Sequence, residues 1–255
     1  MEFIEFYLTD YSFVFDTNFS LACMIILIGR TIQGYSGFGG AIIIIPALAI
    51  LFNPITALSM TMFMSFFSNI IVLPEATKKA NYSEVLPVII GNTATISLGI
   101  SFFLAAEPSL IRQDMGFAIL IIALILLSGW TYKGKRNFFV GVSFGSFSGI
   151  ILRSFGVPAG PFTAIYYMSS PAIPEIKRAN ITLTFGVAVF VVMATLIISK
   201  SFSEKILLLS IFTLPFALIG TWTGKYIFKV LPTTWYKKAT FFILFLTGIT
   251  ILLKG

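Results

Sequence analysis

Apolar residues fill most of the chain in runs that are separated by short polar connections. Since about 20 apolar residues are needed to cross a bilayer as a helix, eight runs are predicted to span it: 19–34, 55–73, 85–105, 115–131, 138–152, 181–199, 206–227 and 235–253. Two more apolar pieces, 41–52 and 162–168, are too short to cross unaided. They are predicted to be half-helices or tilted short helices, enclosed by the rest of the protein.

Each short piece follows a glycine-rich break that begins near an arginine. The first break reads Gly29-Arg30-Thr31-Ile32-Gln33-Gly34-Tyr35-Ser36-Gly37-Phe38-Gly39-Gly40, and the second reads Arg153-Ser154-Phe155-Gly156-Val157-Pro158-Ala159-Gly160-Pro161. An arginine within a bilayer costs at least about 2.5–3.5 kcal/mol and usually marks a functional site. The alternatives are that the arginines snorkel to the interface, more easily for Arg153, and that the glycines only serve helix packing.

The two halves of the chain repeat this order of elements. In both, a glycine-rich break and a short element are followed by a proline, Pro54 in the first half and Pro174 in the second. Counting the short pieces gives five elements per half, so the second half must begin on the opposite side of the membrane. The sequence therefore predicts an all-α integral membrane protein of two inverted repeats, 1–131 and 132–255, whose substrate site lies at the repeat interface.

The composition and the distribution of charge support a membrane location. Of the 255 residues, 57% are hydrophobic and 11% are charged, against about 25% charged in soluble domains. Sorting the lysines and arginines of the predicted connections puts eleven on one side and four on the other, which predicts a multi-pass protein of the cell (inner) membrane with the basic loops in the cytoplasm. The N-terminal segment 1–18 is then extracytoplasmic. The net charge of +7 is attributed to those loops, not to binding of nucleic acid.

Several kinds of chemistry lack the residues they need. The chain has no histidine and a single cysteine, Cys23, and its ten acidic residues are predicted to lie outside the middle of the spans. No catalytic residue, metal site or cofactor is therefore expected, and a proton relay has no acid to use. An intramembrane enzyme would need a lysine base at mid-depth, and none is predicted there. A membrane assembly factor would leave the paired arginines unexplained.

The embedded charge is thus positive, and the predicted partners are a small anion and the lipid bilayer. Guanidinium groups and the N-termini of restarted helices both bind oxyanions. The residues predicted to bind the substrate share a place in or beside the two breaks: Arg30, Arg153, Gln33, Ser36, Gly37, Gly39, Gly40, Ser154, Phe155, Gly156 and Gly160. Tyr35 and Phe38 are predicted to gate the site.

The two breaks also resemble the paired motifs of the sulfite exporter TauE/SafE family, also called the toluene sulfonate uptake permease family. The resemblance rests on the segment from Gly34 to Leu48 and on Gly156-Val157-Pro158-Ala159-Gly160-Pro161-Phe162. It departs from the commonest pattern at Ala41, Pro158 and Ala159. It implies secondary transport of sulfur-containing anions such as sulfite, thiosulfate or sulfoacetate. An anion channel of the same architecture, a non-sulfur organic anion as substrate, the direction of transport and a homodimer all stay open.

Overall fold

The computed structural model describes residues 16–128, 132–152, 156 and 160–230, and within these ranges it contains helices but no strands. The helices in chain order are α2 (Thr17–Ser36), α3 (Gly40–Leu51), α4 (Pro54–Lys79), α5 (Tyr82–Ala105), α6 (Pro108–Leu127), α7 (Phe138–Ile150), α9 (Gly160–Met168), α10 (Pro174–Ile198) and α11 (Glu204–Val230). The all-α prediction is confirmed, and the two short elements after the breaks are α3 and α9.

Five of these helices, α2, α4, α5, α10 and α11, are long and apolar enough to cross a membrane. The chain is therefore a multi-pass membrane protein. The eight predicted spans are not all matched, because α7 has only 13 residues and α6 is not among the five. The span predicted at 235–253 lies outside the described residues.

Prolines mark the starts of the two central helices. Pro54 and Pro174 both stand in the first turn, where the missing N–H of proline costs nothing. In α4, the side chain of Asn53 also accepts a 2.8 Å hydrogen bond from the backbone N–H of Thr56. The prediction that the second of these helices begins at residue 181 was wrong: α10 begins at Pro174, so Arg178 lies on a helix and not in a loop.

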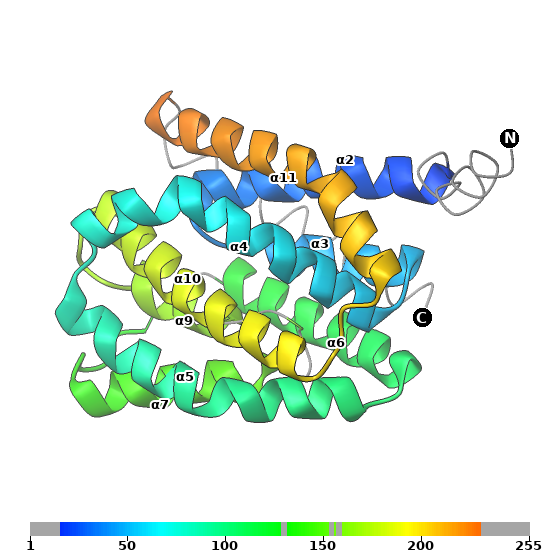
Figure 1. Cartoon of the computed structure of the whole chain (residues 1–255). Coiled ribbons are helices and arrows are strands. Elements are labelled where there is room, and N and C mark those ends of the chain that lie inside the picture. The colour runs from blue at the N-terminus through cyan, green and yellow to red at the C-terminus, as the bar shows by residue number, and fades with distance from the viewer. Residues whose placement is uncertain (1–15, 129–131, 153–155, 157–159, 231–255) are drawn as a thin grey trace, which may run out of the picture.

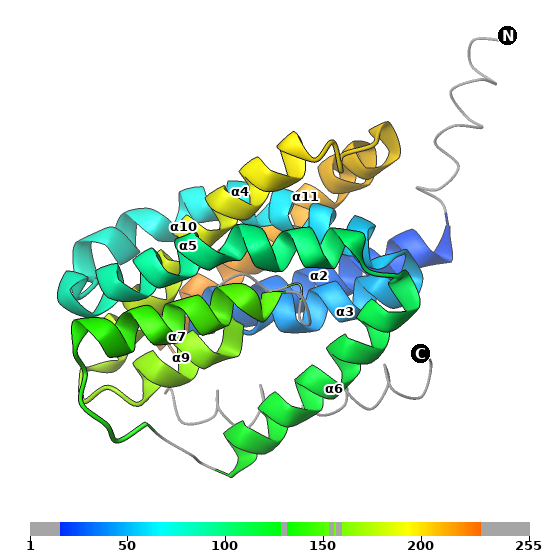
Figure 2. The same ribbon diagram turned by 90° about the horizontal axis from the view of Figure 1, so that it is seen from below.

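The helices pack as two lateral pairs around a central one (Figures 1 and 2). α2 lies along α11 and α5 lies along α7, while α4 and α10 run between these pairs and contact each other. α6 crosses the edge of the bundle (Figure 2). The lateral pairs are close because glycine faces backbone: a Cβ atom added at Gly34 would strike the Thr221 carbonyl oxygen, and one at Gly145 would strike that of Val88.

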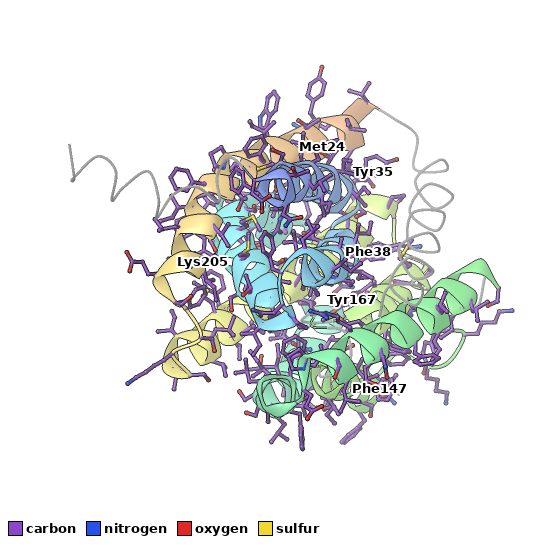
Figure 3. The ribbon with its side chains drawn as sticks, turned by 90° about the vertical axis from the view of Figure 1, so that its right-hand side faces the viewer. Met24, Tyr35, Phe38, Phe147, Tyr167 and Lys205 are labelled. Atoms are coloured by element: carbon purple, nitrogen blue, oxygen red, sulfur yellow. The ribbon has the colours of Figure 1, made fainter. Side chains whose placement is uncertain are left out.

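Large apolar side chains occupy both the interior and the outer faces. In Figure 3, Phe38 and Tyr167 lie inside the bundle, where they are 2% and 0% exposed, whereas Met24 and Phe147 are 60% and 50% exposed at its surface. Such a surface is stable only in an apolar solvent, so these outer faces are suited to lipid.

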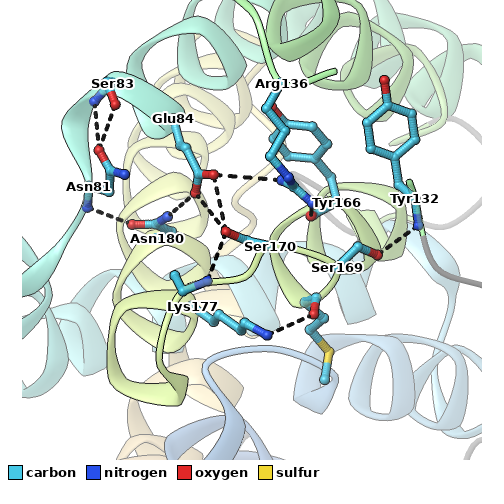
Figure 4. A network of polar contacts seen from close by, with 12 residues as sticks. Asn81, Ser83, Glu84, Tyr132, Arg136, Tyr166, Ser169, Ser170, Lys177 and Asn180 are labelled. Atoms are coloured by element: carbon cyan, nitrogen blue, oxygen red, sulfur yellow. Dashed lines mark hydrogen bonds and ion pairs between the residues drawn. The ribbon is translucent and has the colours of Figure 1, made fainter. Parts of the chain in front are cut away.

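The N-terminal parts of α5 and α10 and the C-terminal end of α9 meet in a polar group that we call the Glu84 cluster, shown in Figure 4. It consists of Glu84, Arg136, Tyr166, Ser170 and Asn180. The Glu84 carboxylate accepts hydrogen bonds from Asn180 Nδ2 at 3.0 Å and Ser170 Oγ at 3.1 Å, and lies 3.7 Å from Arg136 Nη1. Arg136 also lies over the Tyr166 ring and donates to its carbonyl at 2.8 Å. The cluster ties α5, α9 and α10 to the segment before α7.

Basic side chains cap the C-terminal ends of both short helices. Arg112 donates to the carbonyl oxygen of Ala49 at 3.1 Å, at the end of α3. At the end of α9, Arg136 donates to Tyr166 and Lys177 Nζ donates to the Met168 carbonyl at 3.1 Å. A cation at a helix C-terminus offsets the negative end of the helix dipole. The two short helices thus have their C-terminal ends anchored by charge.

Candidate functional site: a cavity beside the first glycine-rich break

The first break is a sharp turn between α2 and α3 that requires glycine. Gly37 and Gly39 have φ values of 82° and 88°, a region that side-chain-bearing residues rarely adopt. Ser36 ties the turn together, because its hydroxyl contacts the carbonyl oxygen of Phe38 and accepts from the Phe38 N–H at 3.0 Å. No side chain caps the start of α3, so the N-terminus of a 12-residue helix opens beside this turn.

A cavity of about 20 Å³, roughly the room of one water molecule, lies beside this turn; we call it the central cavity. Four helices supply its walls: α2, α4, α10 and α11. The lining residues are Gln33, Gly34, Gly37, Ser68, Asn69, Val72, Arg178, Thr182, Phe185 and Thr221. No aspartate or glutamate is among them, and the only charged one is Arg178.

Three polar atoms of this wall are buried and have no hydrogen-bond partner within the described residues: Ser68 Oγ, Asn69 Nδ2 and Arg178 Nε. Each can donate a hydrogen bond. A buried donor without a partner costs about 1–3 kcal/mol. Three such donors at one cavity therefore lower the free energy of unfolding considerably. An acceptor-rich anion in the cavity would satisfy them.

The Arg178 guanidinium is held in place from two sides. Its Nη2 donates to the Gly34 carbonyl oxygen at 2.7 Å, and its central carbon lies 4.4 Å from the centre of the Phe228 ring. Gly37 lies close by, because a Cβ atom added there would come within 3.1 Å of the Arg178 carbonyl oxygen. The first break and the start of α10 therefore meet at this guanidinium, whose Nε is left for a ligand.

Arg30 lies one layer behind the cavity. It is 1% exposed and donates to Gln33 Oε1 at 2.9 Å, to the Thr61 carbonyl at 2.7 Å and to Ser65 Oγ at 2.8 Å. It is not among the residues that line the cavity, but it donates to the side chain of Gln33, which is one of them. Among the described residues no carboxylate pairs with Arg30, so its buried charge lacks a counterion.

Among the described residues of the predicted site, the structure brings together those of the first half. Gln33 and Gly37 line the cavity, Gly40 packs against Gln33, and Ser36, Phe38 and Gly39 build the turn. Tyr35, predicted as a gate, lies edge-on to Phe228 with ring centres 5.9 Å apart.

Of the second break, the structure describes Gly156 beside apolar side chains, and Gly156 is not among the residues that line this cavity. Gly156 has the expected positive φ, 62°, but an added Cβ atom would meet Ile45, Phe103 and Met115. Those neighbours are apolar, so this part of the second break offers an anion no polar side chain. Gly160 begins α9 as predicted, and Arg153, Ser154 and Phe155 lie outside the described residues.

Sequence reasoning missed Arg178, Ser68 and Thr182 as lining residues and treated Asn69 as one of several polar residues that pair between helices. Arg178 was counted among cytoplasmic loop charges. The pattern Pro174-Glu175 was the available signal, because proline and an acidic residue favour the first turn of a helix. Starting the helix there would have placed Arg178 one turn inside it.

The paired short helices, the glycine turn and the cationic cavity invite comparison with known proteins. The model of the sulfite exporter TauE/SafE family matches residues 21–251 of the chain. The chain belongs to the TauE/SafE family. Comparisons with curated proteins and with solved structures gave no match. TauE/SafE proteins are membrane transporters, so the site is interpreted below as part of a transport path.

Proposed function

We propose that this TauE/SafE protein is a secondary transporter of small sulfur-containing anions, such as sulfite, thiosulfate or sulfoacetate. The anion binds in the central cavity, which opens to the two sides of the membrane in turn. The observation that carries this proposal is the set of unpartnered buried donors, Ser68 Oγ, Asn69 Nδ2 and Arg178 Nε, on an acid-free wall.

The chemistry of the wall suits a group with three oxygens. Arg178 supplies a planar fork that matches an oxyanion, while Ser68 and Asn69 supply separate donors from α4. A carboxylate holds its acceptor sites in one plane, whereas sulfite or a sulfonate directs three oxygens in three directions, which better suits donors that come from different helices. The buried charge of Arg30 adds a field of the same sign behind the cavity.

The cavity is too small in this structure for such an anion. Its volume of about 20 Å³ corresponds to one water molecule, so the substrate can enter only when the walls separate. The structure therefore supports a contracted form of the site, and transport requires helix movement between α4, α10 and the first break.

The proposed architecture is a pair of inverted repeats. Matching α2–α5 with α7–α11 makes α2 equivalent to α7, α4 to α10 and α5 to α11. Under this matching the pair α2 with α11 is equivalent to the pair α7 with α5, and these are the two most extensive helix pairs. The cationic caps at the ends of α3 and α9 are a second correspondence.

The orientation is proposed from the basic residues, which gather at the end of the bundle where α4 and α11 finish and α10 begins. That end is assigned to the cytoplasm. After Cys23→Ser, a cysteine at Lys133 should resist an impermeant thiol reagent in intact cells, whereas one at Lys200 should react. The reverse labelling would overturn the assignment.

A competition series tests the substrate class. A labelled sulfonate is bound to the purified protein, and sulfite, sulfoacetate, acetate and chloride are added in turn. Sulfite and sulfoacetate should compete at least about tenfold better than acetate, since an unsatisfied donor costs about 1–3 kcal/mol. Equal competition by acetate would favour the transporter of a non-sulfur organic anion.

Flux measurements separate a transporter from a channel of the same architecture. In proteoliposomes, a transporter should show saturable uptake and should accelerate when unlabelled substrate is placed on the opposite side. An anion channel would show neither effect.

A further inference from the structure

A second cavity, of about 10 Å³, lies next to the central cavity and nearer the basic end of the bundle. We call it the inner cavity. Val72, Arg178 and Thr182 line both cavities. The other lining residues of the inner cavity are Glu75, Ala76, Lys79, Glu175, Ala179 and Phe228. The two cavities therefore follow one another along α4 and α10, with Arg178 in the wall between them.

Unlike the central cavity, the inner cavity is lined by carboxylates. One of them, Glu75, already pairs with the neighbouring cations. Glu75 Oε1 lies 3.0 Å from Lys79 Nζ, and Glu75 Oε2 lies 3.7 Å from Lys225 Nζ. Arg178 also attracts this carboxylate electrostatically. Lys225 does not line the cavity but is fixed next to Glu75 by a 2.9 Å hydrogen bond to the Ile71 carbonyl, so a cation remains beside the cavity whether or not Glu75 stays.

We infer that the inner cavity is a second binding site for the transported sulfur oxyanion, and that the anion enters it by displacing the Glu75 carboxylate from Arg178, Lys79 and Lys225. This inference rests on the proposed function. The Glu75 carboxylate then acts as a tethered competitor: it holds the inner cavity closed in the absence of substrate and returns when the anion leaves.

The charges around the inner cavity allow this exchange. Three cations, Lys79, Arg178 and Lys225, face two carboxylates, Glu75 and Glu175, and Glu175 forms no ion pair among the described residues. Replacing the Glu75 carboxylate by a sulfur oxyanion preserves the charge balance or improves it. The side chains of Glu75 and Lys79 are 26% and 49% exposed, and partly exposed ion pairs are weak, so Glu75 can be released at small cost.

Arg178 connects the two sites. Its guanidinium lies on the Phe228 ring, which lines the inner cavity, while its Nη2 donates to the carbonyl oxygen of Gly34, which lines the central cavity. An anion can therefore pass between the cavities without leaving the same cation. The second site is a release site on the basic side of the bundle.

The test is Glu75→Gln in the full-length protein, with binding of sulfite and of sulfoacetate measured by calorimetry in detergent. Removing the tethered competitor should tighten binding at least about fivefold, the lower range of coupling between sites. Uptake into proteoliposomes should slow, because the anion leaves the inner cavity less readily. Glu204→Gln, which removes a charge at the start of α11 near the opposite end of the bundle, should leave affinity unchanged.

Unchanged or weaker binding by Glu75→Gln would overturn the inference, as would an equal change in Glu204→Gln. If Glu75→Gln does not fold, Glu75→Asp carries the test, since its shorter side chain is a poorer competitor and should give intermediate tightening; wild-type affinity would overturn it. The proposed function fails separately, if wild-type protein binds neither anion. If it binds both and Asn69→Leu weakens them, only the inner site is in question.

Discussion

The bundle holds two polar groups that differ in how their hydrogen-bonding atoms are used. In the Glu84 cluster, both carboxylate oxygens accept hydrogen bonds and Arg136 supplies the opposite charge. At the central cavity, three buried donors have no partner in the described structure, and Arg30 behind it has no carboxylate. The Glu84 cluster also leaves one buried donor, Arg136 Nη1, without a hydrogen bond, but this donor lies 3.7 Å from the Glu84 carboxylate, whereas the described lining of the central cavity contains no carboxylate.

We therefore expect the Glu84 cluster to stabilise the fold and the central cavity to bind substrate. A polar cluster whose members satisfy one another stabilises the arrangement of the helices that carry it. A group of donors that all lack acceptors destabilises the folded protein, and under the proposed function the substrate anion supplies the acceptors. Variants of the cavity's donor side chains should therefore change binding and spare stability, and variants in the Glu84 cluster should do the opposite.

The largest effect on binding is expected for Arg178→Met, with Arg136→Met as its matched control. Both arginines lie over an aromatic ring and donate to a backbone carbonyl. Sulfite binding should weaken about 100-fold in Arg178→Met, because hydrogen bonds to a charged group are worth about 1.5–3 kcal/mol. Arg136→Met should lower the melting temperature and keep the dissociation constant. A loss of affinity in both variants would remove the distinction between the two polar groups.

Arg30→Met should reduce sulfite affinity at least about tenfold while the protein still inserts, since removing a buried cation makes insertion easier. The loss has two causes: the positive field falls, and Gln33, which lines the cavity, loses the hydrogen bond that Arg30 donates to it. Arg30→Lys should also bind poorly, because an ammonium lacks the planar fork that reaches Gln33, Thr61 and Ser65. Calorimetric titration checks both, and wild-type affinity in Arg30→Met would remove Arg30 from the site.

The same substitution at two asparagines, Asn69→Leu and Asn180→Leu, compares the central cavity directly with the Glu84 cluster. Asn69 has an unpartnered Nδ2, whereas Asn180 bonds Glu84 and the backbone of Asn81. Asn69→Leu should weaken sulfite binding about fivefold, the value of a neutral hydrogen bond, and should raise the melting temperature. Asn180→Leu should lower it by leaving the Asn81 N–H without its acceptor. A stability loss in Asn69→Leu would mean that its amide has a structural partner.

The smallest effect on binding is expected at the two breaks. Gly37→Ala and Gly156→Ala both place a side chain at positive φ, which costs about 1–2 kcal/mol of stability. Of the two glycines, Gly37 lines the central cavity and Gly156 does not. Gly37→Ala should therefore also weaken sulfite binding, by about twofold, which is near the lower limit for the loss of one neutral hydrogen bond. Equal effects on affinity would indicate that both breaks face the substrate.

The sequence predicted the helical class, the two glycine turns and the short helices, because these depend on local properties: apolar run length, glycine and proline. It predicted the site only in part. Gln33 and Gly37 belong to the break itself, but Arg178 and Asn69 reach the cavity because α4 and α10 cross there, and packing of distant helices has no local signal. The cost of a buried charge identified Arg30 correctly as buried; it did not show that Arg30 acts through Gln33.

The close lateral pairs described above also bear on how the protein is made. α2 packs through glycine contacts against α11, which comes much later in the sequence. The Gly91 face of α5 likewise packs against α7, which is made after it. During synthesis, helices of the first half therefore enter the bilayer with their narrow glycine faces against lipid. The two halves of the sequence are then not separate units of folding: neither can complete its helix contacts before the other has been inserted.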